Sequence, residues 1–388
     1  MGEAILRVVV LGRLALAGAS PPPGIALEPV VPGAPVPPAE VYVLPFRQGK
    51  EAWGGLRALH AAGIVGEPRP SQGPLIFLWA LRPEANPAPF APFADATLLG
   101  GGGARLMAWL ERLRAGRSGG RAERFAGLAE AGGLLLEEAQ ARVTAWPPEG
   151  PAETGPPRAL PPPGAADRSL TPEGLLALEP GHPDLAVQAG LGSQLGAAEV
   201  GAFAAEAVGH GLRRLLLHFW IGLGPDEARA IARWCRRCRH ETVHRLRDDR
   251  RAPPITVRAG CFVPRPWTPF QWMGMAPVET LAATLRRLRE EGRGLGWLTL
   301  TADLPKWARL EALLARGDRR VAEIVRLALR DGDWERALIE SPWNPAWFVH
   351  RPRPRDEAFP WDRLDWGLDR EALWRQYEAF RAATGRPA

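Results

Sequence analysis

The first third of the chain alternates short apolar runs with longer amphipathic segments. Residues 6–11, 41–44 and 75–79 are apolar over the length of a strand, whereas residues 54–62 and 104–113 place their apolar positions three and four apart. The first pattern predicts buried strands and the second predicts helices that cover them. Because strands that alternate with helices form parallel sheets, we expect an α/β domain here, with helices on the faces of the sheet.

The apolar start of the chain, residues 5–17, allows two interpretations. Its length would suit the apolar part of a signal peptide, but Arg7 and Arg13 interrupt the run. The three consecutive valines at 8–10 are β-branched, and such residues favour a buried strand. We therefore predict a strand at this position.

A proline-rich stretch separates the first part of the chain from the rest. Residues 146–167 include three consecutive prolines at 161–163, which excludes a helix or a central strand. We predict a linker there. It divides the sequence into a first domain (1–145), a second domain (168–275) and a helical C-terminal extension (276–388).

The second domain repeats the alternation of strands and helices. Apolar runs predict its strands, and helical spacing with start signals such as Pro172 and Asp226 predicts its helices. The expected strands are 185–189, 215–220 and 255–263, and the expected helices are 170–178, 197–208 and 226–246. From residue 278 onward the spacing is mainly helical, with Pro-rich and Trp-rich interruptions.

The charge of the chain is a weak guide to its partners. The formal net charge is +6, yet only Lys50 and Lys306 are lysines among the 49 basic residues. This preference for arginine, together with 43 glycines and 41 prolines, is typical of a GC-rich genome. The basic balance is therefore weak evidence for nucleic acid. No apolar run reaches the roughly 18 residues that a membrane span needs, so we expect no membrane-embedded segment.

Three cysteines, Cys235, Cys238 and Cys261, are too few for a disulfide framework and fit a protein of the reducing cytoplasm. The first two have the spacing of half a zinc site, and the third, or a nearby histidine, could complete it. No second CxxC pair exists, however. On the predicted helix 226–246 both cysteines share an apolar face, where cysteine packs as a small hydrophobic residue. We favour packing and keep the metal site as the alternative.

Four consecutive glycines, 100–103, follow a possible strand at 96–99 and precede a predicted helix. Backbone N–H groups at such a turn can bind phosphate. The Lys-Ser/Thr pair of a P-loop is missing, as is a GxGxxG pattern followed by an acidic residue. We predict a tight turn, which glycine adopts readily.

Twelve of the 16 tryptophans lie at or after Trp220, where they alternate irregularly with arginines. Aromatic and guanidinium groups together can stack on the bases of single-stranded nucleic acid. Irregularly spaced tryptophans more often fill a core or cover an interface. An RNA-binding accessory protein therefore stays as one alternative.

The segment that follows the third strand of the second domain is the most distinctive in the chain. Residues 262–272 read Phe-Val-Pro-Arg-Pro-Trp-Thr-Pro-Phe-Gln-Trp. This resembles the Phe-Val-Pro-Lys-Pro-His-Thr-Pro-Phe-Gln-Trp signature of a radical S-adenosylmethionine (SAM) family whose members carry an N-terminal cobalamin-binding-like domain. The resemblance implies a Rossmann-like first domain followed by a βα barrel.

Other segments resemble the same family in the same order. Residues 215–224 are similar to its fifth barrel strand, 310–320 to its post-barrel helix, and 359–367 to its Leu-Pro-Trp-Asp-x-Ile-Asp-x-Gly element. Looser matches in the first domain are 62–64, 74–76, and the Asn-Pro-Ala-Pro at 86–89 with Asp95. The resemblance covers most of the chain and is strongest after about residue 215.

The chain lacks the residues that radical SAM chemistry needs. In the family a CxxxCxxC loop ligates three irons of a [4Fe–4S] cluster, and the fourth iron binds SAM; thiolates are the required ligands. That loop would lie before residue 170, where this chain has only the proline-rich stretch. None of Cys235, Cys238 and Cys261 corresponds to a cluster ligand.

Other family positions differ as well. The Pro-Glu-x-Gly-Ser that ends the family's fourth strand corresponds to Ala-Gly-Leu-Gly-Ser at 189–193, which lacks the carboxylate. Pro225 and Asp226 replace a Thr-Glu pair, and Arg265 and Trp267 replace the Lys and His of the signature. The Asp-x-His-x-x-Gly loop that binds cobalamin is absent.

We therefore expect an α/β protein with an N-terminal Rossmann-like domain, a truncated radical-SAM-type barrel of three βα units and a helical extension. The expected function is that of a non-catalytic scaffold or partner subunit, without a resident cofactor. An alternative keeps SAM in a vestigial pocket at Ser193, Gly222 and Gly224, with residual or partner-completed radical chemistry. Because three βα units cannot close a barrel, we expect another chain or a second copy to cover the open edge.

Overall fold

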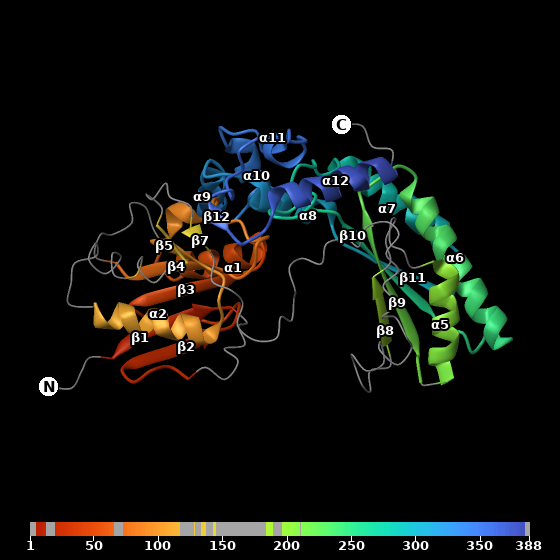
Figure 1. Ribbon diagram of the computed structural model, residues 1–388, viewed down its shortest axis with the longest axis horizontal. Helices are drawn as coiled ribbons and strands as arrows, with labels where there is room; N and C mark the ends of the chain where they lie inside the picture. Colours follow the sequence, from red (N-terminus) through yellow and green to blue (C-terminus); the bar gives the residue numbers. More distant parts are fainter. Residues whose placement is uncertain are drawn as a thin grey trace. The chain divides into compact units, whose positions relative to one another are not determined.

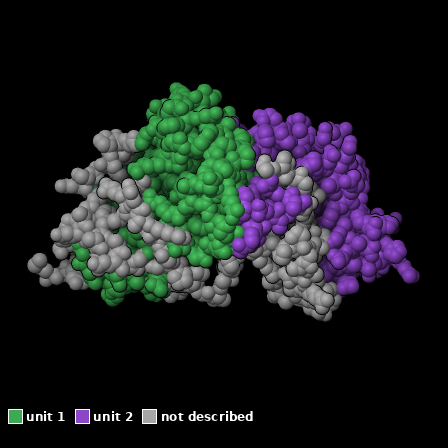
Figure 2. All heavy atoms as spheres, turned by 45° about the horizontal axis from the view of Figure 1, so that its top comes forward, with its two compact units in different colours: residues 1–157, 264–273, 311–373 green, residues 158–263, 274–310, 374–388 purple. Residues whose placement is uncertain are grey.

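The computed structural model describes residues 5–12, 20–65, 73–116, 128, 133–136, 143–144, 184–188, 196–209 and 211–384. The chain divides into two compact units, each assembled from non-consecutive segments (Figure 2). Unit 1 takes 1–157, 264–273 and 311–373, and unit 2 takes 158–263, 274–310 and 374–388. The predicted linker and the helix expected at 170–178 lie outside the described residues.

Unit 1 is built on a six-stranded sheet with the order β2-β1-β3-β4-β5-β6 (Figure 1). All neighbouring pairs are parallel except β5 and β6, which are antiparallel. The strands are β1 (Leu6–Leu11), β2 (Ile25–Val30), β3 (Val41–Phe46), β4 (Leu75–Ala80), β5 (Ala96–Leu99) and β6 (Leu134–Leu136). The sheet is therefore mixed but mostly parallel.

Both faces of the central strands are buried, which explains their continuous apolar sequence. Every residue of β3, β4 and β5 is buried. Helix α2 (Gly103–Ala115) packs Trp109 and Leu110 into one core with alternate strand residues such as Val43 and Phe77. Helix α1 (Gly49–Ala61) packs on the opposite face of the sheet, where it contacts Leu44. A methyl group on Gly55 of this helix would lie 3.0 Å from Leu44 Cδ2.

Segments from late in the chain complete unit 1. The helices are the second half of α8 (Pro305–Arg316), α9 (Val321–Asp331), α10 (Trp334–Glu340), α11 (Pro345–Val349) and the start of α12 (Arg370–Thr384). Strand β12 (Leu364–Asp365) pairs in parallel with β7 (Val143–Thr144). Helix α8 packs so tightly on the start of α1 that a methyl group on Gly49 would lie 2.4 Å from the Cβ of Leu314.

Helices α1 and α8 of unit 1 are tied by polar groups at their ends. The Glu311 carboxylate accepts hydrogen bonds from the backbone N–H groups of Gly49 (3.1 Å) and Lys50 (3.0 Å), which open α1. Asn86 Nδ2 donates to the carbonyls of Leu314, Ala315 and Gly317 at 2.7–3.2 Å, where α8 ends. Helix ends leave such backbone groups without partners inside the helix, so each side chain satisfies groups that burial would otherwise penalise.

Unit 2 contains a four-stranded parallel sheet in which the strands lie in chain order (Figure 1). The strands β8 (Asp184–Gln188), β9 (Arg214–Ile221), β10 (Ile255–Cys261) and β11 (Leu298–Ala302) alternate with helices α5 (Ala197–Gly209), α6 (Glu227–Leu246) and α7 (Val278–Gly292). Strand β9 buries Leu215, Leu217, Phe219 and Ile221 and leaves the residues between them partly or fully exposed. One face of this sheet is therefore packed against helices and the other carries more polar residues.

The predicted strands and helices that fall on described residues are present, but β2, β6, β7, β11 and β12 were not predicted. Strand β2 was not predicted, because Glu28 and Pro29 interrupt its short apolar sequence at the edge of the sheet. Strand β11 was not predicted either: the expectation of mainly helical structure after residue 278 is wrong there, and the second sheet has four strands, one more than expected. The four-glycine segment connects β5 to α2, and Gly100 and Gly101 have the positive φ that glycine adopts readily.

Gly201 permits the close approach of α5 and α6. A methyl group at this position would lie 2.5 Å from the carbonyl oxygen of Cys238 and 2.8 Å from the Cβ of Glu241. Both atoms belong to the helix opposite, so one helix must move. We expect Gly201→Ala to lower the free energy of unfolding by roughly 2 kcal/mol, the scale of overpacking.

Gly209, in the last turn of the same helix, is the matched control. Nothing lies within 4 Å of a methyl group placed there, so Gly209→Ala should leave stability unchanged or slightly increased. Denaturant unfolding of both variants measures the difference. Equal stability of the two variants would contradict the packing assigned to Gly201.

Candidate functional site

In the loop that follows β9, three consecutive backbone N–H groups form a ring around the carboxylate of Glu227. The N–H groups of Gly222, Leu223 and Gly224 donate to the two carboxylate oxygens of Glu227 over 2.6–2.8 Å. Glu227 opens α6 and is 2% exposed. Consecutive N–H groups of this kind form a concave anion site. Here the anion is a side chain of the protein itself, so an external carboxylate or phosphate would have to displace Glu227.

The backbone at this strand end requires glycine. Gly222 has φ of +97°, and a methyl group there would lie 2.9 Å from Leu281 Cδ2. Asp226, just before α6, is also left-handed, with φ of 52°. Two of the three residues predicted for a SAM pocket, Gly222 and Gly224, thus lie together in this loop, and the third, Ser193, lies outside the described residues.

The three cysteines are buried in unit 2. Cys235 and Cys238 lie on the inner face of α6, and Cys261 is the last residue of β10. Burial raises the pKa of each thiol to about 12. A metal or cluster binds the thiolate, so its binding would have to overcome this raised pKa. Within the described part of the chain no group of three or more His, Cys, Asp and Glu side chains could hold a metal ion.

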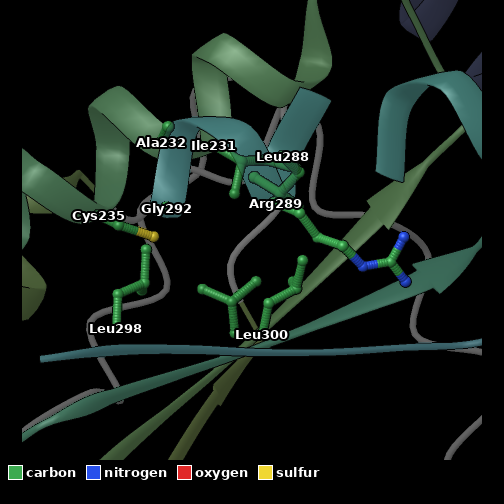
Figure 3. A pocket seen from close by; sticks show the side chains of 9 residues that line it. Ile231, Ala232, Cys235, Leu288, Arg289, Gly292, Leu298 and Leu300 are labelled. Atoms are coloured by element: carbon green, nitrogen blue, oxygen red, sulfur yellow. The ribbon is translucent and has the colours of Figure 1, made fainter. Parts of the chain in front are cut away.

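The surroundings of Cys235 are apolar. It lines a cavity of about 170 Å³ between α6, α7 and the sheet, and Figure 3 shows its sulfur pointing toward Leu298. The other lining residues are Ile231, Ala232, Val257, Leu288, Arg289, Gly292, Leu298 and Leu300. A space this small and apolar is a packing gap, since ligand pockets are usually larger and carry convergent polar groups. The described thiols therefore do not fit an iron–sulfur cluster.

The less covered face of the unit 2 sheet brings functional groups together. The register of β9 and β10 pairs His218 with Arg258 and Trp220 with Gly260. Arg258 Nη2 lies 3.9 Å from Asp303 Oδ1, just beyond β11. Trp220 is 41% exposed and covers Gly260, where a methyl group would lie 2.8 Å from the indole ring.

The charge state of this strand-end cluster (His218, Trp220, Arg258 and Asp303) follows from its neighbours. Partial burial, and then the Arg258 guanidinium, lower the pKa of His218, so the imidazole is neutral at pH 7. The cluster thus offers a neutral imidazole, an ion pair and an exposed indole near the carboxyl ends of parallel strands. That is where α/β proteins bind their ligands. Arg258 and Asp303 were not predicted; only the alternation of exposed and buried positions signals them.

The recognisable segment 262–272 contributes mainly to packing. Gln271 Oε1 accepts from the Trp267 backbone N–H (3.1 Å) and from Trp361 Nε1 (2.8 Å). Arg265 forms a 3.0 Å ion pair with Glu311, the residue that caps α1. Three segments that are distant in sequence therefore meet inside unit 1 through the side chains of Gln271, Glu311 and Trp361.

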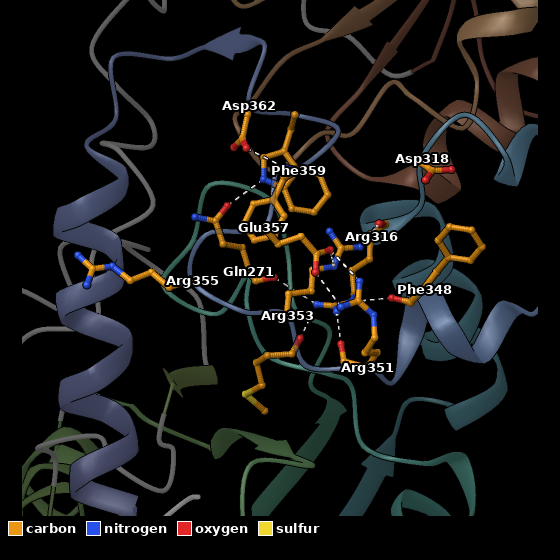
Figure 4. Close-up of polar contacts among 12 residues, drawn as sticks. Gln271, Arg316, Asp318, Phe348, Arg351, Arg353, Arg355, Glu357, Phe359 and Asp362 are labelled. Carbon is orange, nitrogen blue, oxygen red and sulfur yellow. Dashed lines mark hydrogen bonds and ion pairs between the residues drawn. The ribbon is translucent and has the colours of Figure 1, made fainter. Parts of the chain in front are cut away.

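A buried guanidinium joins this cluster to the C-terminal loops (Figure 4). Arg316, 1% exposed, donates to the carbonyls of Gln271, Met273, Phe348 and Arg351. These acceptors are backbone carbonyls, whose dipoles solvate the charge. Sequence reasoning missed Arg316, because its partners are backbone atoms.

No family model matches the chain, and no curated protein and no solved structure matches it. No helix in the described ranges is long and apolar enough to cross a membrane.

Removal of the Glu227 carboxylate should destabilise the protein, because two buried N–H groups and one partly buried N–H group would lose this acceptor. We expect Glu227→Ala to cost about 3 kcal/mol, and Glu227→Gln, which keeps one oxygen, to cost less. The control is Glu279→Ala at the exposed start of α7, which should change stability by less than about 0.5 kcal/mol. Denaturant unfolding measures all three; a loss for Glu227→Ala no larger than the control's would refute the role of the ring.

The buried thiols make stability depend on pH. Their pKa is about 12 in the folded protein and about 8.5 in an unfolded chain. Between these values the folded state retains protons that the unfolded state releases, so the free energy of unfolding falls as pH rises. Each thiol contributes a slope of up to about 1.4 kcal/mol per pH unit. Replacing Cys235, Cys238 and Cys261 by Ala should flatten the alkaline fall, and identical pH profiles for the two proteins would argue against thiol burial.

Proposed function

We propose that the chain is a non-catalytic scaffold or partner subunit built on a degenerate radical-SAM-like frame. The observation that carries the proposal is the ring of Gly222, Leu223 and Gly224 N–H groups around Glu227. In this proposal the strand end that the resemblance associates with SAM is closed by the protein's own carboxylate. It serves to fix the start of α6 on the sheet.

The order of the strands supports the proposed frame. Parallel strands that lie in chain order and alternate with helices on one face are typical of consecutive units of a βα barrel. Helices on both faces of a mostly parallel sheet are typical of a Rossmann-like domain, which is what we propose for the sheet of unit 1. A four-stranded piece of a barrel cannot close, so its inner face needs another cover.

The strand-end cluster suits a protein partner on that face. An exposed indole beside a guanidinium is a common centre of a protein interface, because tryptophan and arginine bring large contact areas and directional hydrogen bonds. Trp220 and Arg258 provide this pair. We therefore propose that another chain, or a second copy of this one, lies against these residues.

The alternative of residual radical SAM chemistry requires more changes to the described residues. SAM would have to displace Glu227 from its three N–H donors, and a cluster would need thiolates that are exposed and convergent. Cys261 instead donates to the Asp303 carbonyl at 3.8 Å. The packing and capping roles of these side chains thus favour the scaffold over the enzyme.

Anaerobic reconstitution tests the proposal. Incubation of the full chain with iron and sulfide should yield no stoichiometric [4Fe–4S] cluster, and SAM should not be cleaved to 5′-deoxyadenosine under reductant. The control replaces Cys235, Cys238 and Cys261 by Ser; it should be less stable and spectroscopically the same as the wild type. A SAM-responsive iron–sulfur signal that disappears in this variant would overturn the non-catalytic assignment.

A further inference from the structure

A second cavity, remote in sequence from the strand-end cluster, lies in unit 1 at the start of α9. Its volume is about 310 Å³, close to the lower limit for pockets that bind small ligands. The residues that line it are Pro92, Arg319, Arg320, Ala322, Glu323, Arg326 and Trp343. The proposed scaffold function makes no use of this cavity.

The lining of the cavity favours an anion. It carries three guanidinium groups, of which that of Arg326 pairs with the lining carboxylate of Glu323 and that of Arg320 pairs with Asp318. The first turn of α9 contributes Ala322 and Glu323, so the positive end of this helix dipole adds to the field. Arginine is well suited to phosphate, because its planar fork donates two parallel hydrogen bonds.

The side chain of Arg320 is fixed before any ligand arrives. Its Nε and Nη2 donate to the two oxygens of Asp318 over 2.7–3.1 Å. Its guanidinium carbon lies 5.2 Å from the ring centroid of Trp343 and 5.0 Å from that of Trp347. Arg351 stacks on Trp347 at 4.2 Å, which extends the series of alternating indole and guanidinium groups. A preorganised arrangement of this kind lowers the entropy cost of binding.

The indole of Trp343 supplies a planar surface at the cavity. Trp343 lines it and is 39% exposed, and Trp347 next to it is 44% exposed. Exposed tryptophans held in place by arginines are a costly arrangement on a surface with no ligand, since their apolar area stays in water. Bases stack on such indoles, and arginines then contact the phosphate.

We propose that this cavity binds a nucleotide, with its base on Trp343 and its phosphate held by Arg319 and Arg326. The volume suits one nucleotide rather than a dinucleotide. The nucleotide can be free or can be a residue of a single-stranded nucleic acid. This proposal does not depend on the scaffold function, because it concerns other residues.

Isothermal titration calorimetry of the full chain with adenosine 5′-monophosphate tests the site. Adenosine lacks the phosphate and inorganic phosphate lacks the base, so each should bind at least about tenfold more weakly, in line with the usual contribution of stacking or of a phosphate contact. The affinity for the nucleotide should fall as salt is added. No detectable binding at millimolar nucleotide would overturn the proposal.

Paired variants separate the cavity from general basic charge. Trp343→Ala, and the double variant Arg319→Gln with Arg326→Gln, should each weaken binding about tenfold or more. The controls are Trp307→Ala, an exposed tryptophan outside the cavity, and Arg233→Gln with Arg237→Gln, which removes the same charge from the exposed side of α6. Both controls should change the affinity less than about twofold, because none of these residues lines the cavity. Equal losses in controls and cavity variants would overturn the proposal.

A short oligoadenylate distinguishes the two sources of the nucleotide. Much tighter binding of the oligonucleotide than of the mononucleotide, lost in the cavity variants, would assign the site to single-stranded nucleic acid. Equal affinity of the two would assign it to a free nucleotide. Oligonucleotide binding that survives in the cavity variants while the mononucleotide does not bind would contradict the site.

Discussion

The buried guanidinium of Arg316 is the interaction on which the C-terminal part of unit 1 depends. It donates to carbonyls from segments around residues 271–273 and 348–351 and so fixes loops that have little regular structure of their own. A buried cation without these acceptors would cost several kcal/mol. The loops therefore take the one arrangement in which their carbonyls converge on it. Trp361, which is fully buried, donates to the side chain of Gln271 in one of these segments.

The same principle operates at three other places in the chain. Asn86 satisfies the end of α8, Glu311 satisfies the start of α1, and Glu227 satisfies the loop after β9. In each case one polar side chain binds several backbone groups of a distant or neighbouring segment.

Apolar patterns predicted most of the elements, because burial leaves a periodic trace. β3 and β4 are buried on both faces and read as continuous apolar runs, and α6 carries its buried residues on one helical face. β11 was missed because helices lie on both sides of it in the sequence, although its alternating Leu and Thr residues have the period of a strand. Glu227 and Arg316 could not be predicted, because a backbone partner has the same chemistry at every residue and leaves no mark in the sequence. The Trp343 cavity needed the fold, since Pro92 and Arg326 are distant in sequence.

The contact between Asn86 and α8 has a consequence for the order of synthesis. The side chain and its acceptors are separated by 228 or more residues, so a ribosome completes the first sheet long before α8 exists. During that interval the start of α1 lacks its Glu311 acceptor and the apolar surface beneath α8 is open to water. Closing so long a loop is entropically costly and slow. The nascent N-terminal sheet is thus an incomplete body that needs protection from aggregation until nearly the whole chain has emerged.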